Sequence, residues 1–126
     1  MQRGGRERLS RLRKSLGDFL REIQGVFEIL TDHHAMVKGS VYELQRRCGK
    51  PTCACATGKL HASLVLSWSE NGHTRLKSVP SERVGQLKEL TGHYQRFRKA
   101  RARLVQIQKK MLDVIHRLED ARRQEP

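Results

Sequence analysis

The stretch ASLVLSWSENGHTRLKSVP, residues 62–80, decides how the middle of the chain folds. Its first half alternates, so that three large apolar residues share one face of a strand: Leu64, Leu66 and Trp68. Asn71-Gly72 follows, and this pair is favoured in two-residue type I′ turns because both central residues need positive φ. The stretch therefore predicts a β-hairpin whose return strand ends at Pro80.

The two-residue turn also predicts which residues face each other across this hairpin. It places Trp68 opposite Arg75, Leu66 opposite Lys77 and Leu64 opposite Val79. We expect Leu64 and Leu66 to face the core, while Trp68 is compatible with either face. Trp68, Arg75 and Lys77 are candidate nucleic-acid contacts, since a small sheet backed by a helix can enter a DNA groove.

Working outward, residues 39–80 predict a three-stranded antiparallel sheet. SVYELQRR, residues 40–47, supplies the first strand, and a Cys-rich loop joins it to the second. On the N-terminal side, apolar residues recur at spacings of three and four, which predicts a helix over residues 5–34. Those residues are Leu9, Leu12, Leu16, Phe19, Ile23, Val26 and Leu30.

A second, longer helix is predicted over residues 81–122. Its heptad positions are Leu87, Leu90, Tyr94, Phe97, Arg101, Leu104, Gln108, Met111, Ile115 and Leu118. Ile107 and Val114 widen this stripe, and Gly92 is a point where the helix could kink. The two helices are expected to pack antiparallel, giving a single α+β domain over residues 1–126. The overhang of the longer helix predicts a homodimer, with packing inside one monomer as the alternative.

All three cysteines lie in CGKPTCACATGKLH, residues 48–61. The spacing C-x4-C-x-C-x5-H offers four ligands for a tetrahedral zinc ion: Cys48, Cys53, Cys55 and His61. Cys53 and Cys55 would point the same way if their segment is extended. A Cys3His set leaves no open coordination position, so the predicted zinc ion is structural.

The sequence is also compatible with other fourth ligands and with roles of the thiols that involve no metal. The fourth ligand could be His73, His33 or His34 instead of His61. The thiols could also lie at the hairpin end without a metal, or take part in redox chemistry, since Lys50 and Lys59 would favour a thiolate. No nucleophile with a positioned base and no phosphate-binding loop is recognisable, so an enzyme is not expected.

The charge of the chain predicts a polyanionic partner. There are 26 Lys and Arg against 13 Asp and Glu, a net charge of +13 in 126 residues. Nucleic acid, most simply DNA, is the expected partner. On the long helix, Arg96, Lys99 and Arg103 share one face and could follow a phosphate backbone. The alternative is that this face is merely solvated.

No run of 18 apolar residues is present, so no membrane-spanning helix is predicted. The basic start MQRGGRERLSRLRK leads into no apolar segment and is not expected to be a secretory signal. With three cysteines and no such signal, we expect a cytoplasmic protein whose thiols are reduced or bound to metal.

The segments KGSVYELQRRCGKPTCACATGKLH, LSWSENGHTRLKSVP and YQRFRKARARL resemble an uncharacterised prokaryotic family, a domain of unknown function. The resemblance covers residues 37–104, and the Cys-His loop is its most specific part. Members of this family are found near transposases and other mobile genes. The resemblance implies a common module in a bacterial or archaeal protein and no particular activity.

Taken together, the sequence predicts a small, non-catalytic, DNA-binding protein with a structural zinc loop, acting as an accessory to a mobile element. The alternative is a structural or interaction protein that oligomerises through its heptad helices, with the charge serving only solubility. The two differ in salt dependence, because phosphate contacts weaken with salt whereas an apolar helix interface does so little.

Overall fold

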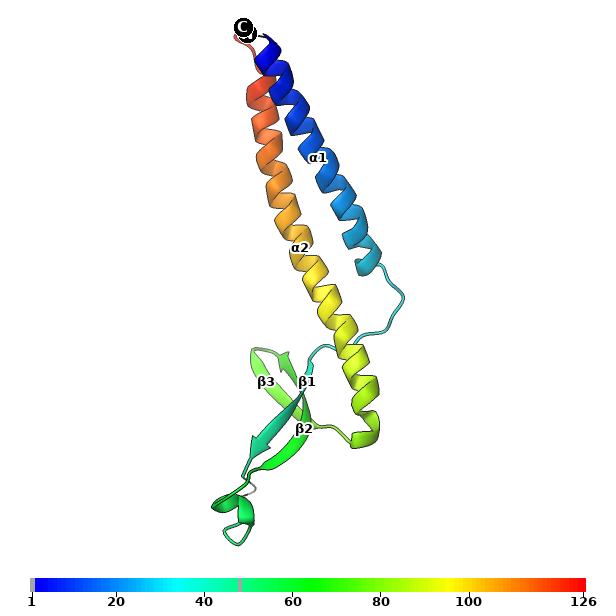
Figure 1. Cartoon of the computed structure of the whole chain (residues 1–126), viewed down its shortest axis with the longest axis vertical. Coiled ribbons are helices and arrows are strands. Elements are labelled where there is room, and N and C mark those ends of the chain that lie inside the picture. Colours follow the sequence, from blue (N-terminus) through cyan, green and yellow to red (C-terminus); the bar gives the residue numbers. More distant parts are fainter. Residues whose placement is uncertain (1, 48) are drawn as a thin grey trace. The chain divides into compact units, whose positions relative to one another are not determined.

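A computed structural model describes residues 2–47 and 49–126 of the chain. Helix α1 (Gln2–Leu30) precedes a sheet of three strands, β1 (Ser40–Arg46), β2 (His61–Glu70) and β3 (His73–Ser78). Short 3-10 turns lie at Ala54–Ala56 and Ser81–Arg83, and helix α2 (Val84–Arg122) follows (Figure 1). The α2 helix packs against α1, so the predicted α+β class, with two helices and an antiparallel sheet, is confirmed.

The chain divides into two compact units, which we call the helical unit and the sheet unit. The helical unit comprises Met1–His33 and Arg96–Pro126, and the sheet unit comprises His34–Gln95. Helix α2 contributes its first part to the sheet unit and the rest to the helical unit. It runs without interruption through Gly92, so the predicted kink does not split it. The single domain over residues 1–126 stays a prediction.

Helix α1 ends at Leu30, four residues before the predicted end at residue 34. The backbone N–H and the hydroxyl of Thr31 both donate to the Phe27 carbonyl, at 2.9 and 2.7 Å. The N–H of Asp32 reaches the Ile29 carbonyl at 3.3 Å, a tightened final turn. The Thr31 side chain thus adds a second donor to the Phe27 carbonyl, and the polar residues after Thr31 add no further turn.

The core of the helical unit is an apolar seam between the two antiparallel helices. Val26, Ala100 and Ile107 are buried at its centre, with Phe19, Ile23, Leu104 and Met111 packed against them. On α2 the seam therefore follows 100, 104, 107, 111 and 114, one residue before the predicted positions 101, 108 and 115. Leu104 and Met111 lie at predicted positions, and Ile107 and Val114, which were predicted to widen the stripe, are buried, whereas Ile115 is exposed.

The β2–β3 hairpin has the predicted turn and register. Asn71 and Gly72 adopt φ of 53° and 80°, as a type I′ turn requires. Trp68 lies opposite Arg75 and Leu66 opposite Lys77, and the Val79 N–H donates to the Leu64 carbonyl at 2.9 Å. Strand β1 pairs with the other edge of β2, which completes the antiparallel order β1-β2-β3.

The most deeply buried residue of this sheet is Val65, not Leu64 or Leu66. Val65 lies on the face opposite to the one that Leu64, Leu66 and Trp68 share, while Leu64 and Leu66 are only half-buried. Val65 sits in the central strand with Tyr42 of β1 and Ser78 of β3 on either side of it. Leu66 is likewise paired on both sides, with Val41 and Lys77, but it borders a hollow that Val37 and Leu87 also line.

Gly39 provides a sharp test of this arrangement. Its φ is +141°, and a Cβ there would lie 2.5 Å from the Ser67 carbonyl oxygen. We expect Gly39→Ala to lower the free energy of unfolding by about 2 kcal/mol or more, because both the backbone angle and the strand spacing are violated. Chemical denaturation measures this change.

The matched control is Gly85→Ala in the first turn of α2. A Cβ at Gly85 meets nothing within 4 Å, and its φ is not in the positive range. This variant should be neutral or more stable by up to about 1 kcal/mol. Equal losses at both positions would contradict the account given for Gly39.

Candidate metal centre

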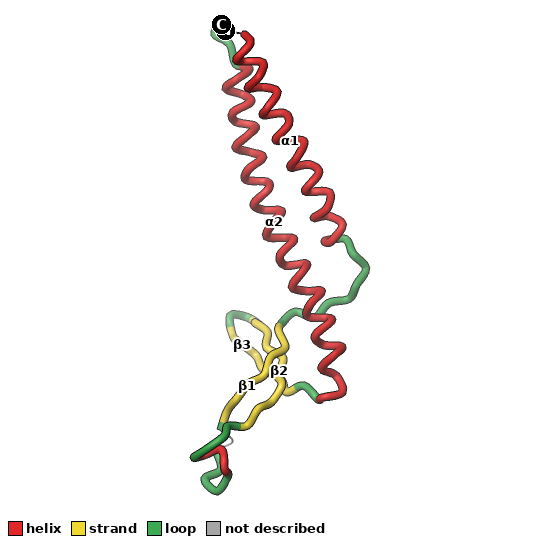
Figure 2. The backbone as a smooth tube through the Cα atoms, viewed as in Figure 1, coloured by secondary structure: helices red, strands yellow, loops and turns green. Residues whose placement is uncertain are grey.

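The loop of residues 47–60 joins β1 to β2 and forms one end of the sheet unit (Figure 2). It begins where Arg46 pairs with His61, the first residue of β2. Within the loop the Cys53 N–H donates to the Lys50 carbonyl at 3.1 Å, and the Ala56 N–H donates to the Cys53 carbonyl at 3.0 Å. Two successive turns thus fold the segment back on itself.

Cys53 and Cys55 are brought together by a 3-10 turn, Ala54–Ala56, rather than by an extended segment. The condition under which we expected the two thiols to point the same way, an extended segment, is therefore not met. The turn allows Gly58 to pass close to the Ala54 carbonyl, from which an added Cβ would be 3.1 Å away. Cys55 is buried, whereas Cys53 is half-buried and His61 is exposed.

The Sγ atoms of Cys53 and Cys55 and a ring nitrogen of His61 all lie within 4.8 Å of one another. The Cys53 Sγ and His61 Nε2 atoms are 3.1 Å apart. Ligand atoms that share one tetrahedral zinc ion are about 3.5–3.8 Å apart, given the usual Zn–S and Zn–N distances. Shifts of about 1 Å or less would therefore bring the three into one coordination shell, so this cluster could hold a metal ion.

The fourth predicted ligand, Cys48, lies outside the described residues. Of the alternatives, His73 is excluded by the hairpin itself. His73 begins β3 and pairs with Glu70, at the far end of β2 from His61. At about 3.3 Å per residue, nine residues of strand separate the two histidines by roughly 30 Å.

Of the other two alternatives, His33 belongs to the helical unit, and His34 of the sheet unit does not belong to the cluster. His34 instead stacks on His93 of α2, with ring centroids 4.4 Å apart and an angle of 11° between the rings. Within the described part of the chain, the metal-binding potential is concentrated on the three loop residues.

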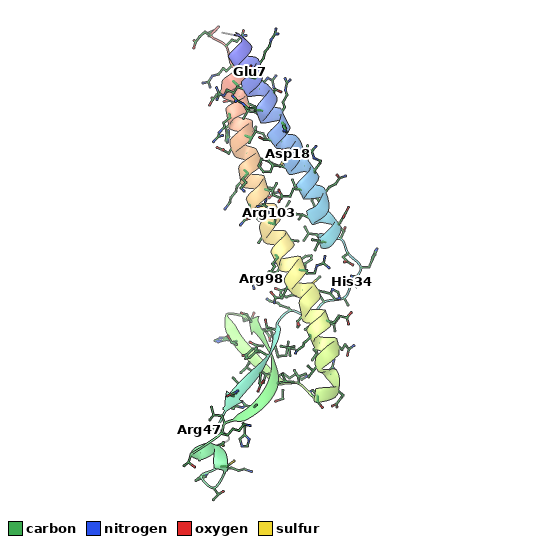
Figure 3. All side chains as sticks on the ribbon, viewed as in Figure 1. Glu7, Asp18, His34, Arg47, Arg98 and Arg103 are labelled. Atoms are coloured by element: carbon green, nitrogen blue, oxygen red, sulfur yellow. The ribbon has the colours of Figure 1, made fainter. Side chains whose placement is uncertain are left out.

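A run of exposed cations flanks the cluster in the sequence, and the sequence analysis did not single it out as a binding surface. Its members are Arg46, Arg47, Lys50 and Lys59, which we call the loop cations. No carboxylate occurs between Glu43 and Glu70 in the sequence, so the loop has no acidic residue of its own to neutralise them. Figure 3 shows Arg47 where β1 enters the loop. The 26-residue gap between acids was the signal that could have found this surface.

The predicted contacts on the hairpin have an acidic neighbour. The Trp68 indole N–H donates to Glu70 Oε2 at 3.2 Å, and Arg75 Nε lies 3.9 Å from the same oxygen. Glu70 therefore neutralises part of the charge that was assigned to nucleic-acid binding. Lys77 is exposed and borders the hollow next to Leu66.

The three cations predicted on the long helix differ from one another. Arg103 forms an ion pair with Glu22 of α1 and is half-buried against it. Arg96 and Lys99 are exposed in the same helical unit. Figure 3 labels Arg103 on the middle part of α2. Arg103 is thus better explained by packing of the two helices than by contact with phosphate.

None of the described helices combines the length and the apolar character that crossing a membrane would require.

Comparison with known proteins identifies the family but no activity. The model of a family described as "Domain of unknown function (DUF6788)" matches residues 6–89, more than half of the chain. No curated protein and no solved structure matches the chain. The protein belongs to the DUF6788 family, as the resemblance to an uncharacterised family led us to expect.

Proposed function

Starting from membership of a family whose domain has no assigned function, we propose that this protein binds DNA without catalysis and holds one structural zinc ion in its Cys/His loop. Cys53, Cys55 and His61 would supply three ligands, and Cys48 is the proposed fourth. When bound, the ion would fix the fold of a loop whose described residues form short turns and bury Cys55. An accessory role at mobile elements, which the family resemblance suggests, is compatible with such a protein.

The observation that supports DNA binding most directly is the carboxylate-free stretch around the metal cluster. Four exposed cations lie in residues 46–59, and the nearest acids in sequence are Glu43 and Glu70. Elsewhere, acidic residues neutralise several cations of the chain, as in Asp113–Arg117, Glu119–Arg123 and Glu22–Arg103. A loop whose cations have no local acid and whose backbone a metal would fix suits the phosphate backbone of DNA.

The proposal is tested by removing charge from the loop alone. We expect the triple variant Arg47→Gln, Lys50→Gln, Lys59→Gln to weaken binding to a fluorescein-labelled DNA duplex by at least about tenfold. The slope of log affinity against log salt, between about 50 and 200 mM, should become shallower by about 2 to 3, since each lost phosphate contact removes about 0.9. Fluorescence anisotropy measures both quantities.

A matched control changes three exposed cations of the same unit outside the loop: Lys38→Gln, Arg83→Gln and Lys88→Gln. Both triple variants have the same net charge, so the difference between them reports the position of the charge. Equal weakening by both would contradict a binding surface at the loop. Absence of DNA binding by the unaltered protein would reject the function itself.

Arg96 and Lys99 of the helical unit remain a second candidate surface for DNA. They are exposed, and no carboxylate lies between Glu89 and Asp113 in the sequence. The double variant Arg96→Gln, Lys99→Gln, measured in the same experiment, separates a contribution of this helix from that of the loop.

A further inference from the structure

Among its described residues, the helical unit leaves five large apolar side chains on its surface. They are Leu20, Phe27, Val105, Leu112 and Ile115, each between 45% and 57% exposed. Each of them directly follows a seam residue in the sequence: Phe19, Val26, Leu104, Met111 and Val114. Their exposure is therefore regular along both helices.

This regularity places all five on one side of the helix pair. A helix turns about 100° per residue, so each exposed side chain is rotated in the same sense away from the seam. Because α1 and α2 run antiparallel within the unit, that sense of rotation leads to the same face on both helices. We call it the apolar face. A hollow lined by Leu20, Ile23, Gln24 and Phe27 lies on its α1 half.

The opposite face of the helix pair is charged. The residues that directly precede seam positions lie there, and they include Asp18, Glu22, Arg103, Lys110 and Asp113. Glu22 and Arg103 pair with each other across the two helices on this side. The helical unit thus has one face suited to water and one face suited to a further apolar surface.

We propose that the apolar face binds a second copy of this chain, with α2 packed against an antiparallel α2 of the partner. On α2 the apolar face continues as a stripe at spacings of four and three: Arg101, Val105, Gln108, Leu112, Ile115 and Glu119. A two-fold axis level with residue 110 makes this stripe complementary to itself. Arg101 then lies opposite Glu119 of the second copy, and Val105 lies opposite Ile115.

The charges at the two ends of the stripe favour this occupant over an unrelated protein. Two copies joined in this register pair Arg101 with Glu119 twice, once at each end, and place the apolar residues between them.

The area of the apolar face is also close to what a stable dimer interface requires. Helix α1 has 29 residues, so the pair is about 40 Å long. At about 20 Å across two packed helices, the face approaches the roughly 800 Å² per partner of a stable interface.

The oligomeric state of the full chain tests the proposal. Sedimentation equilibrium should give twice the chain mass of 14.6 kDa for the unaltered protein. Leu112→Glu should shift it to the monomer, because a charge would be buried in the apolar interface. The control Gln106→Glu, an exposed change on the charged face of the same helix, should leave the dimer intact. If the unaltered protein is still monomeric at a concentration of about 100 μM, which is about 100 times a micromolar dissociation constant, the proposal is overturned.

The register has its own test, which does not depend on the fold tolerating Leu112→Glu. Glu119→Arg should weaken the dimer at least about tenfold, because it places two arginines opposite each other at both ends. Adding Arg101→Glu should restore dimerisation by exchanging the two charges. Failure of this double variant to recover would overturn the antiparallel register. Circular dichroism of each variant confirms that helix content is unchanged.

Discussion

Cys53→Ser should abolish the proposed binding of zinc and lower the melting temperature of the protein by about 10 °C or more. Cys53 contributes one of the three clustered ligand atoms, and zinc that binds only the folded loop stabilises the folded state. A loss of about 2 kcal/mol in a unit of this size corresponds to a shift of that order. Elemental mass spectrometry of the purified protein and thermal unfolding measure the two effects.

A nearby substitution and a chelator separate loss of metal from loss of packing. Thr52→Ser changes the adjacent exposed residue of the same loop and should leave both zinc content and melting temperature unchanged. A chelator should destabilise the unaltered protein as much as the mutation does, and should have no effect on Cys53→Ser. If chelator and mutation both leave the melting temperature unchanged, the loop holds no structural metal.

Ile107→Ala should destabilise the helical unit by about 2–5 kcal/mol. Ile107 is 0% exposed at the centre of the seam, and truncating it leaves a cavity between α1 and α2. The loss is large for a unit built from only two helices, since few other buried side chains compensate for it. Chemical denaturation monitored by circular dichroism in the helical band measures the change in unfolding free energy.

Lys109→Ala is the control for this substitution. Lys109 lies two residues further along the same helix and is exposed, so its truncation should change the unfolding free energy by less than about 0.5 kcal/mol. A comparable loss in both variants would contradict burial in the seam as the cause, because Ala has the highest helix propensity and neither substitution lowers it.

The elements of the fold could be predicted from sequence because their signals are local. Asn71-Gly72 fixes the turn and with it the register of β2 against β3. The phase of the α2 seam could not be predicted in the same way. That helix has two apolar stripes, one buried against α1 and one exposed, and periodicity alone does not distinguish Val114 from Ile115.

For the candidate site, the ligand residues could be predicted from the sequence, but their arrangement in space could not. Residue types and spacing were sufficient to propose Cys53, Cys55 and His61 as metal ligands, although the turn that brings them together was not predicted. Ion pairs between residues far apart in the sequence could not be predicted either. Arg103 looked available for phosphate because its partner, Glu22, is 81 residues away in the sequence.

The position of the Cys/His loop has a consequence for the order in which the sheet assembles. Strands β2 and β3 meet through a two-residue turn, so their hairpin has little chain entropy to overcome and can form within microseconds. Strand β1 can join only after residues 47–60 close on themselves, which is a larger entropic barrier. A metal ion bound to that loop would affect only the later step, in which β1 pairs with β2. Supply of zinc during synthesis would then govern how fast β1 docks, while leaving the first hairpin unaffected.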